Sequence, residues 1–185
     1  YCSYSTTNRI TTPMKTGIEK FTNVIDSETC DLLINYLEDN IHNAVTTEHS
    51  EGQNVICKEI KLQRRTDLDT LIYKVVANVA ALYADEYDRF GANGVFPFQL
   101  RKITGNTKEH IDNITKDYRN VSIIIGLNSD YKKGEFHFPV QDFSTTVKRG
   151  EAIVFPVYFM YPHFVDAPIG NRYTINTWLR NTALS

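Results

Sequence analysis

The sequence has few cysteines and no large excess of charge of either sign. Its three cysteines are Cys2, Cys30 and Cys57, with no C-x-x-C pair, which argues against a disulfide framework or structural zinc and fits a reducing compartment. The net charge of −2 gives no electrostatic support for nucleic acid or an anionic membrane as a partner. No membrane-length apolar run, signal peptide or glycine-rich nucleotide motif is present, so we expect a cytoplasmic protein.

The length and composition favour one globular domain with a β-rich core. The chain has 185 residues, 42% hydrophobic and 12% aromatic, which is enough to build a sizeable core. We expect a single domain over residues 1–185, in which residues 1–16 form a loosely held arm. Residues 17–92 would supply helical support with flanking strands, and residues 95–180 the main β-structure.

Two helical patterns occupy the first half of the chain. One begins at a capping Asp26 or Ser27 and ends near His42, and the other spans residues 66–90. In both, apolar residues recur at helical spacing, which predicts one buried face on each helix. The long polar loop at residues 43–53 is a candidate mobile lid.

From Val95 onward the sequence changes to short β-prone runs separated by turn signals. Helices followed by many short strands predict an antiparallel sandwich or barrel with the helices packed on one face. The predicted strands lie at residues 95–104, 119–128, 134–139, 151–159 and 172–180.

The stretch at residues 149–180 holds a histidine and an arginine at a short spacing. His163 follows an apolar run, a Pro-Ile-Gly-Asn turn lies at residues 168–171, and Arg172 opens the next strand. The turn and its β-rich flanks predict two antiparallel strands joined by a hairpin. We therefore expect His163 and Arg172 to lie near one another.

A second motif, H-x-D, supplies His110 and Asp112. Residues i and i+2 of a strand point to the same face, so both side chains can reach one point. An isolated H-x-D is usually a pair of surface residues, but His163 and Arg172 later in the chain change that balance. Two histidines and one carboxylate leave positions open on a metal, as in non-haem Fe(II) oxygenases, and an arginine nearby can pair with a carboxylate.

The ordered set of these segments is similar to the 2-oxoglutarate/Fe(II)-dependent dioxygenases, and most similar to their prolyl 4-hydroxylase-like branch. The resemblance runs from about Phe98 to Arg180 and includes RNVSIIIGLNSDYKKGEFHFP (119–139) and VKRGEAIVFP (147–156). It implies an α+β, mainly β fold with a double-stranded β-helix (jelly-roll) core at residues 95–180. The N-terminal helices would pack on one sheet as support.

The resemblance also implies roles for individual residues. His110, Asp112 and His163 would be the iron ligands and the catalytic centre, and Arg172 would bind the distal carboxylate of 2-oxoglutarate. The family's upstream tyrosine is missing from RKITGN (101–106), where Lys102 or Ile103 stands. Gly126 would leave room for a ligand. Further cosubstrate-binding candidates are Thr174, Asn176, Trp178, Lys102 and Phe136.

The activity implied is hydroxylation of an unactivated C–H bond, most simply in a peptidyl proline, with release of succinate and CO₂. It requires Fe(II), 2-oxoglutarate and O₂, with ascorbate as a further candidate cofactor. The partner would be a proline-containing protein or peptide, and the small chain suits a bacterial or viral enzyme. Two alternatives remain: another substrate for the same chemistry, such as nucleic acid or a free amino acid, and a non-catalytic jelly-roll module that binds a metal or small acid.

Overall fold

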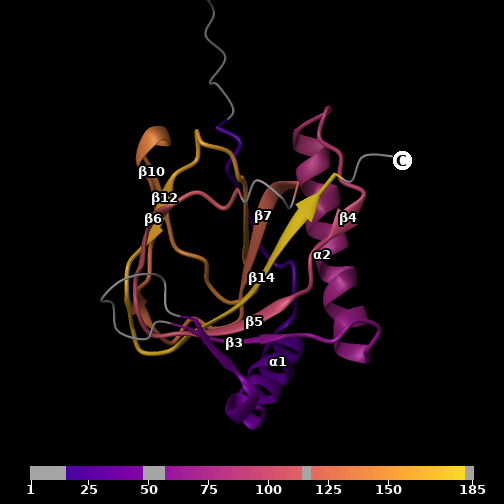
Figure 1. Cartoon of the computed structure of the whole chain (residues 1–185), viewed down its shortest axis with the longest axis vertical. Helices are drawn as coiled ribbons and strands as arrows, with labels where there is room; N and C mark the ends of the chain where they lie inside the picture. The colour runs from indigo at the N-terminus through magenta and orange to yellow at the C-terminus, as the bar shows by residue number, and fades with distance from the viewer. Residues whose placement is uncertain (1–15, 48–56, 114–117, 182–185) are drawn as a thin grey trace, which may run out of the picture.

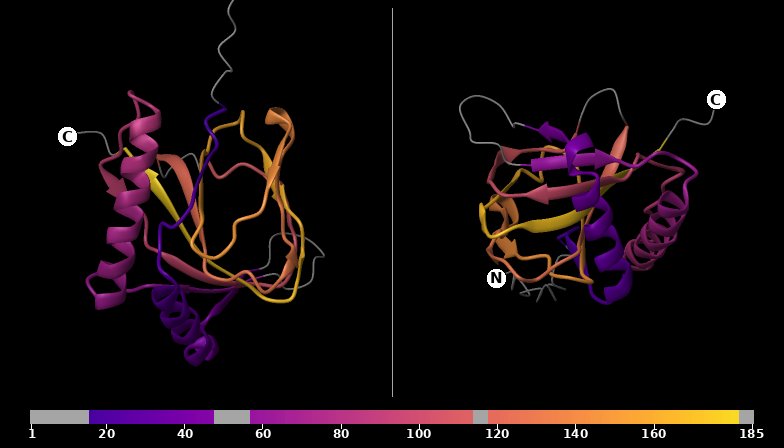
Figure 2. Two further views of the ribbon diagram at one scale, coloured as in Figure 1. Left: turned by 180° about the vertical axis from the view of Figure 1, so that it is seen from behind. Right: turned by 90° about the horizontal axis from the view of Figure 1, so that it is seen from below.

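The computed structural model describes residues 16–47, 57–113 and 118–181. Its strands form an eight-stranded sheet, a four-stranded sheet and a two-stranded sheet, with antiparallel pairing between the strands. The two larger sheets face each other, and both helices lie outside the eight-stranded sheet (Figures 1 and 2). This is the mainly β, α+β jelly-roll architecture that the sequence predicts.

The secondary structure follows the order expected, with helices first and short strands after them. The eight-stranded sheet has the order β1-β11-β7-β14-β5-β3-β2, with β4 paired to β14, and the four-stranded sheet has the order β10-β9-β12-β6. The elements are β1 (Glu19–Phe21), α1 (Ser27–Asp39), η1 (Ile41–Asn43), β2 (Val45–Thr47), β3 (Cys57–Lys61), α2 (Asp67–Glu86), β4 (Gly94–Val95), β5 (Gln99–Ile103), β6 (Thr107–His110), β7 (Arg119–Gly126), β8 (Lys132–Lys133), β9 (Phe136–Phe138), η2 (Pro139–Gln141), β10 (Phe143–Thr145), β11 (Ala152–Pro156), β12 (His163–Val165), β13 (Pro168–Ile169) and β14 (Arg172–Arg180).

Helix α1 begins where the sequence predicts and ends slightly earlier. Asp26 is the N-cap, and its Oδ1 accepts a hydrogen bond from the backbone N–H of Thr29 at 2.7 Å. At the other end the side chain of Asn40 donates to the carbonyl of Tyr36 at 2.8 Å. The α-helix therefore stops before the predicted end near His42, and the short η1 turn continues the chain.

The two helices bury their apolar faces against the outer face of the eight-stranded sheet. Helix α2 is capped by Thr66 and ends at Glu86, four residues short of the predicted end at residue 90. Each fully buried aliphatic side chain in this layer contributes roughly 1.5–3 kcal/mol. The helix residues Leu33, Leu37, Ile72, Val76 and Val79 share one core with the sheet residues Leu100, Ile123, Ile125 and Ile175.

The register between β7 and β14 decides which side chains face the interior between the sheets. Ile175 lies opposite Ile125, and Trp178 lies opposite Ser122. Because side chains alternate across a strand, the two isoleucines face the helices. Ser122 and Trp178 therefore point together to the inner side.

The predicted hairpin between His163 and Arg172 is wrong. Strand β12 pairs with β6 and β9 in the four-stranded sheet, whereas β14 lies in the eight-stranded sheet. Between them, β13 pairs with β8, and Gly170 turns the chain at a φ of +100°. The predicted turn is present, but it joins β13 to β14, and the chain passes from the four-stranded sheet through β13 to the eight-stranded sheet. The side chains of His163 and Arg172 therefore reach the interior from opposite sheets.

Two other predictions fall largely outside the described residues. Residues 1–15 of the predicted arm and residues 48–53 of the predicted lid are not described. The start of the lid segment forms the end of η1 and strand β2, which pairs with β3. Neither helix among the described residues is long and apolar enough to cross a membrane.

Candidate functional site

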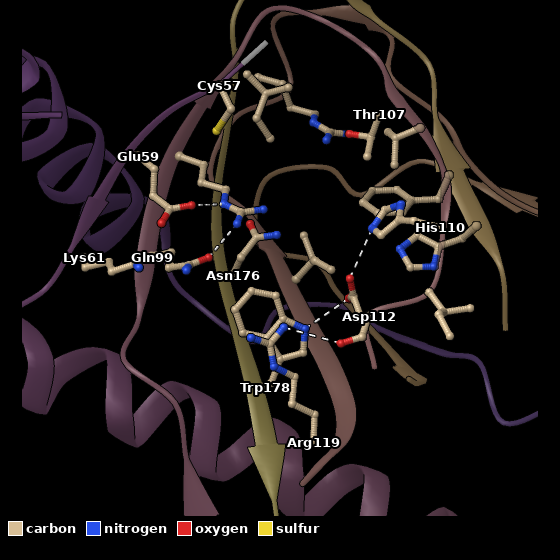
Figure 3. Close-up of a pocket in the computed structure, with 18 residues that line it drawn as sticks. Cys57, Glu59, Lys61, Gln99, Thr107, His110, Asp112, Arg119, Asn176 and Trp178 are labelled. Carbon is tan, nitrogen blue, oxygen red and sulfur yellow. Dashed lines mark hydrogen bonds and ion pairs between the residues drawn. The ribbon is translucent and has the colours of Figure 1, made fainter. Parts of the chain in front are cut away.

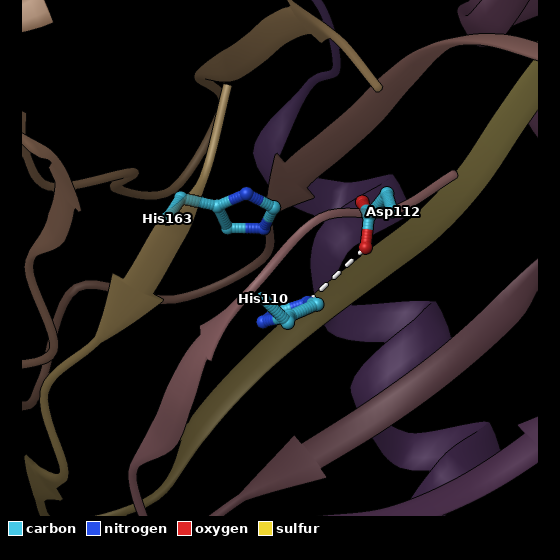
Figure 4. Close-up of side chains that lie close together, drawn as sticks. All are labelled: His110, Asp112 and His163. Carbon is cyan, nitrogen blue, oxygen red and sulfur yellow. Dashed lines mark hydrogen bonds and ion pairs between the residues drawn. The ribbon is translucent and has the colours of Figure 1, made fainter. Parts of the chain in front are cut away.

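Two histidines and an aspartate meet between the sheets (Figure 4). His110 ends β6 and His163 begins β12, and the two are register partners with ring centroids 4.4 Å apart. Asp112 follows β6 by two residues, and one ligand atom from each of the three side chains lies within 4.8 Å of the others. Two imidazole nitrogens and a carboxylate oxygen at this separation could hold one metal ion.

The carboxylate of Asp112 is oriented by hydrogen bonds from the eight-stranded sheet. Ser122 Oγ and Trp178 Nε1 both donate to Oδ2, the latter at 3.1 Å. The other oxygen, Oδ1, lies 3.2 Å from Nε2 of His110. Oδ2 is therefore occupied by protein donors, and Oδ1 is the oxygen that faces the histidines.

Burial and hydrogen bonding set the protonation of the three side chains. Burial by itself raises the pKa of the Asp112 carboxyl, but hydrogen bonds with His110 and Ser122 and the nearby His163 outweigh it and hold the pKa well below the ordinary value. Burial lowers the pKa of His163. Burial acts in the same direction on His110, yet its hydrogen bond with Asp112 raises the pKa overall. An anionic carboxylate beside a neutral buried imidazole is the donor set that a divalent cation requires.

A cavity of about 340 Å³ connects this cluster to Arg172 (Figure 3). Arg172 is 3% exposed, its Nη1 donates to the carbonyl of Gly134 at 2.9 Å, and its guanidinium lies 5.1 Å from the ring centroid of Phe136. Its Nε has no hydrogen-bond partner among the described residues. Burial lowers the pKa of Arg172 to about 10. A buried cation with an unused donor is suited to an anion in the cavity.

The other predicted cosubstrate-binding residues divide into two groups. Phe136, Asn176 and Trp178 line the cavity. Thr174 is fully buried and is not among the lining residues, and its Oγ1 donates to Oδ1 of Asn176 at 2.6 Å. Thr174 therefore orients Asn176 from behind the cavity surface.

Lys102 does not reach the cavity. Its ammonium lies 2.9 Å from the carboxylate of Glu38 on α1 and 5.8 Å from the ring of Tyr173. The reason is the alternation along β5, in which Ile103 faces the cavity and is the register partner of Arg172. At the position where family members often carry a tyrosine, the apolar side chain of Ile103 therefore faces the cavity.

The explanation predicted for Gly126 is also wrong. A Cβ at this position would lie 2.3 Å from the carbonyl oxygen of Lys148 and 2.7 Å from that of Val147. The glycine therefore permits close approach of two backbone segments and does not make room for a ligand.

The cavity contains charged and polar residues that the sequence analysis did not single out. Arg101 Nε donates to Glu59 Oε2 at 2.8 Å, and Arg101 Nη2 donates to Gln99 Oε1 at 2.6 Å. All three side chains line the cavity. The sequence pattern that could have identified them is the alternation along residues 99–103, because it places Gln99, Arg101 and Ile103 on the strand face opposite to the buried Leu100.

His137 lies outside the cavity. Its ring nitrogens are bonded to Ser144 Oγ at 2.8 Å and Asp166 Oδ2 at 3.1 Å, and its ring stacks on Phe164. With Glu135 and Asp166 it forms a second cluster of metal-ligand type, on the outer face of the four-stranded sheet. Both its nitrogens are already used there.

Comparison with known proteins gives a family match and a set of related structures. Residues 98–180 match the family model described as the 2OG-Fe(II) oxygenase superfamily. No curated protein matches the chain.

Solved structures of similar fold cover nearly the whole chain at low identity. A Pseudomonas putida prolyl-4-hydroxylase has a TM-score of 0.73 and 14% identity, over 91% of this chain and 95% of the other. A viral collagen prolyl hydroxylase from Paramecium bursaria Chlorella virus-1 has a TM-score of 0.71 and 15% identity, over 91% and 98%. A prolyl hydroxylase from Trichoplax adhaerens has a TM-score of 0.72 and 16% identity, over 90% and 84%. At these identities the likeness shows the jelly-roll fold.

Proposed function

We propose that the chain is a 2-oxoglutarate/Fe(II)-dependent oxygenase, because residues 98–180 match the model of that superfamily. We propose further that it hydroxylates a proline residue in a protein or peptide, with conversion of 2-oxoglutarate to succinate and CO₂. The single observation that carries the oxygenase assignment is the cavity. It has three metal-ligand side chains on one side and the buried Arg172, without a carboxylate partner among the described residues, on the other.

The residues present fit the metal and the cosubstrate. His110, Asp112 and His163 would hold Fe(II), since they supply two imidazole nitrogens and one inward-facing carboxylate oxygen. Arg172 would hold the distal carboxylate of 2-oxoglutarate, for which its buried charge and its Nε, without a partner among the described residues, are suited. Bound together, Fe(II) and 2-oxoglutarate supply the activation of O₂ that a C–H oxidation requires. No feature of the described residues supports a role for ascorbate.

The protein itself contributes positioning and exclusion of water. Ser122 and Trp178 fix the Asp112 carboxylate, and Phe136 covers the guanidinium of Arg172. A fixed donor set avoids reorganisation when the ligands bind. The apolar lining contributed by Ile124 and Val165 limits water around the reacting groups.

The choice of peptidyl proline rests on the structural neighbours. Three proteins of the same fold carry the names prolyl-4-hydroxylase, collagen prolyl hydroxylase and prolyl hydroxylase, and the third was solved with a hypoxia inducible factor peptide. These names describe those proteins. They supply the substrate class that we propose here for this chain.

The proposal is tested by succinate formation with Fe(II), 2-oxoglutarate and O₂, with and without a panel of capped proline-containing peptides. We expect peptide-dependent succinate and one added oxygen atom per modified peptide, and neither when alanine replaces the proline. His163→Ala should abolish both. If succinate forms but no proline peptide increases its formation or becomes oxidised, the prolyl substrate is rejected. If the protein binds neither Fe(II) nor 2-oxoglutarate, the oxygenase assignment is rejected.

A further inference from the structure

One wall of the cavity presents side-chain N–H groups of two amides and one arginine. The other polar atoms of these side chains already form hydrogen bonds within the protein. Gln99 and Arg101 lie two residues apart on β5, and Asn176 is the register partner of Gln99 on β14. All three line the cavity, and Figure 3 shows Gln99 and Asn176 on neighbouring strands. We call these three residues the donor wall.

Internal hydrogen bonds fix which atoms of the donor wall face the cavity. Gln99 Oε1 accepts from Arg101 at 2.6 Å, so the Nε2 amide is the atom left to face outward. Asn176 Oδ1 accepts a hydrogen bond from Thr174 at 2.6 Å, so the Nδ2 amide of Asn176 also remains to face the cavity. Arg101 uses Nε for Glu59 and Nη2 for Gln99, which leaves Nη1. Within the described part of the chain, none of these three remaining nitrogens has a hydrogen-bond partner.

A ligand that fills the cavity would cut these donors off from water. Asn176 is 8% exposed, and the side chain of Arg101 is 17% exposed. A donor that is cut off from water without an acceptor costs about 1–3 kcal/mol. The cavity surface therefore favours a ligand that is rich in oxygen acceptors.

The charge of the wall decides between the two common kinds of acceptor. Arg101 is ion-paired with Glu59 at 2.8 Å, so this pair carries no net charge. Arg172, the cavity's buried cation, is assigned to the cosubstrate. The donor wall together with Glu59 therefore has no net charge, which suits neutral carbonyl oxygens better than a second carboxylate. Lys61, the register partner of Gln99 on β3, also lines the cavity and adds one positive charge beside the wall.

We propose that Gln99, Arg101 and Asn176 bind backbone carbonyl oxygens of a peptide segment that passes beside the metal site, and so determine substrate specificity. This inference rests on the proposed function and adds to it the residues that select a peptide over a free amino acid. Donors on two adjacent strands can contact carbonyls along an extended segment, as in other cases of main-chain recognition.

Gln99→Glu gives a near-isosteric test. The glutamate still accepts the hydrogen bond from Arg101 but presents an acceptor to the cavity where the amide presented a donor. Gln99→Met removes the donor without adding charge. Gln63→Glu, at an exposed position on the segment after β3, is the matched charge control.

The measurement is calorimetric binding of capped proline-containing peptides to protein loaded with Fe(II) and 2-oxoglutarate under anaerobic conditions, which prevent turnover. We expect both Gln99 variants to bind the peptides about tenfold or more weakly than wild type, the loss of one buried hydrogen bond. Affinities for Fe(II) and 2-oxoglutarate should stay within about twofold, and Gln63→Glu should match wild type in all three.

The outcomes separate the two proposals. Equal peptide affinity in wild type and both Gln99 variants overturns the donor wall and leaves the oxygenase intact. Binding of free L-proline in preference to every capped peptide, or no peptide binding at all, overturns the assignment to backbone carbonyls while Fe(II) and 2-oxoglutarate still bind. A wild-type protein that binds neither Fe(II) nor 2-oxoglutarate overturns the proposed function as well.

Discussion

The indole Nε1 of Trp178 donates a hydrogen bond to Oδ2 of Asp112 at 3.1 Å. Trp178 is also the register partner of Ser122, which donates to the same oxygen. The proposed carboxylate ligand is therefore held by two adjacent strands of the opposite sheet as well as by the short segment that carries it.

Ser122→Ala should weaken metal binding about tenfold to a hundredfold, because residues that orient a ligand typically contribute that much to affinity. The chain contains one tryptophan, so Trp178 emission reports directly on this site during a metal titration. Ser144→Ala is the matched control, since Ser144 bonds to His137 on the outer side of the smaller sheet. Unchanged metal affinity in Ser122→Ala would contradict the positioning role.

Arg172→Met should weaken 2-oxoglutarate binding about a hundredfold or more without destabilising the ligand-free fold. The guanidinium is buried, and burial lowers its pKa to about 10, so the charge is held at a cost until an anion binds. Removing it should leave the thermal midpoint of the ligand-free protein equal or higher. The checks are a 2-oxoglutarate titration and a melting curve, and a large fall in the midpoint would mean that Arg172 is chiefly structural.

Gly126→Ala should destabilise the fold by about 1–3 kcal/mol or more, because the added Cβ would overlap the backbone carbonyls of Lys148 and Val147, and a backbone cannot move aside as a flexible side chain does. Gly91→Ala is the control, since a Cβ there meets no described atom within 4 Å. Urea unfolding of the two variants measures the difference. Similar midpoints would show that the 147–148 segment moves aside without cost.

The metal cluster could be predicted from the sequence because its residues belong to short local motifs. His110 and Asp112 form one tripeptide, and His163 and Arg172 frame one turn. What joins the two halves is pairing of β12 with β6, a contact between positions more than fifty residues apart. Turn residues predict a reversal of the chain but not which strand the chain meets next, which is why the predicted hairpin was wrong.

The donor wall and Lys102 show a second limit. Whether a strand residue faces the cavity or the helices depends on register, and a shift of one residue exchanges the two faces. Lys102 was a predicted cosubstrate-binding residue, with Lys102 or Ile103 at the position of the missing tyrosine, and it is Ile103, with Arg101, that lies on the cavity face. The ion pair between Arg101 and Glu59 joins β5 to β3, so neither strand reveals it alone.

Glu38→Gln should remove a pH-dependent part of the stability. Burial raises the pKa of Glu38, but hydrogen bonds from Lys102 and Tyr173 outweigh it and lower the pKa below its ordinary value of 4.5. A lowered pKa in the folded state stabilises the fold above pH 4.5, and this contribution is lost as the pH falls through the folded pKa.

The difference in unfolding free energy between wild type and Glu38→Gln should therefore be constant from about pH 6 to pH 8 and shrink below about pH 4.5. Because the side chain is 36% exposed, solvent limits the difference to about 1 kcal/mol or less. The exposed Glu28→Gln is the control. A gap that stays constant down to pH 3 would contradict the assignment.

The ion pair between Glu59 and Arg101 should behave asymmetrically when it is dismantled. The side chain of Glu59 is 7% exposed and that of Arg101 is 17% exposed. Arg101→Met leaves a buried carboxylate that must stay unpaired or take up a proton, at a cost of about 3–5 kcal/mol. Glu59→Met leaves the more exposed Arg101 cation unpaired beside the cavity, so this variant should lose less unfolding free energy than Arg101→Met.

The double variant Glu59→Met/Arg101→Met should recover most of the stability lost in Arg101→Met, because a buried pair replaced by apolar side chains of similar volume is often neutral. Urea unfolding of the four proteins gives the coupling energy. The same double variant should also lose peptide affinity, since the Nη1 donor is gone. Additive losses in the cycle would mean that Glu59 and Arg101 contribute separately to stability.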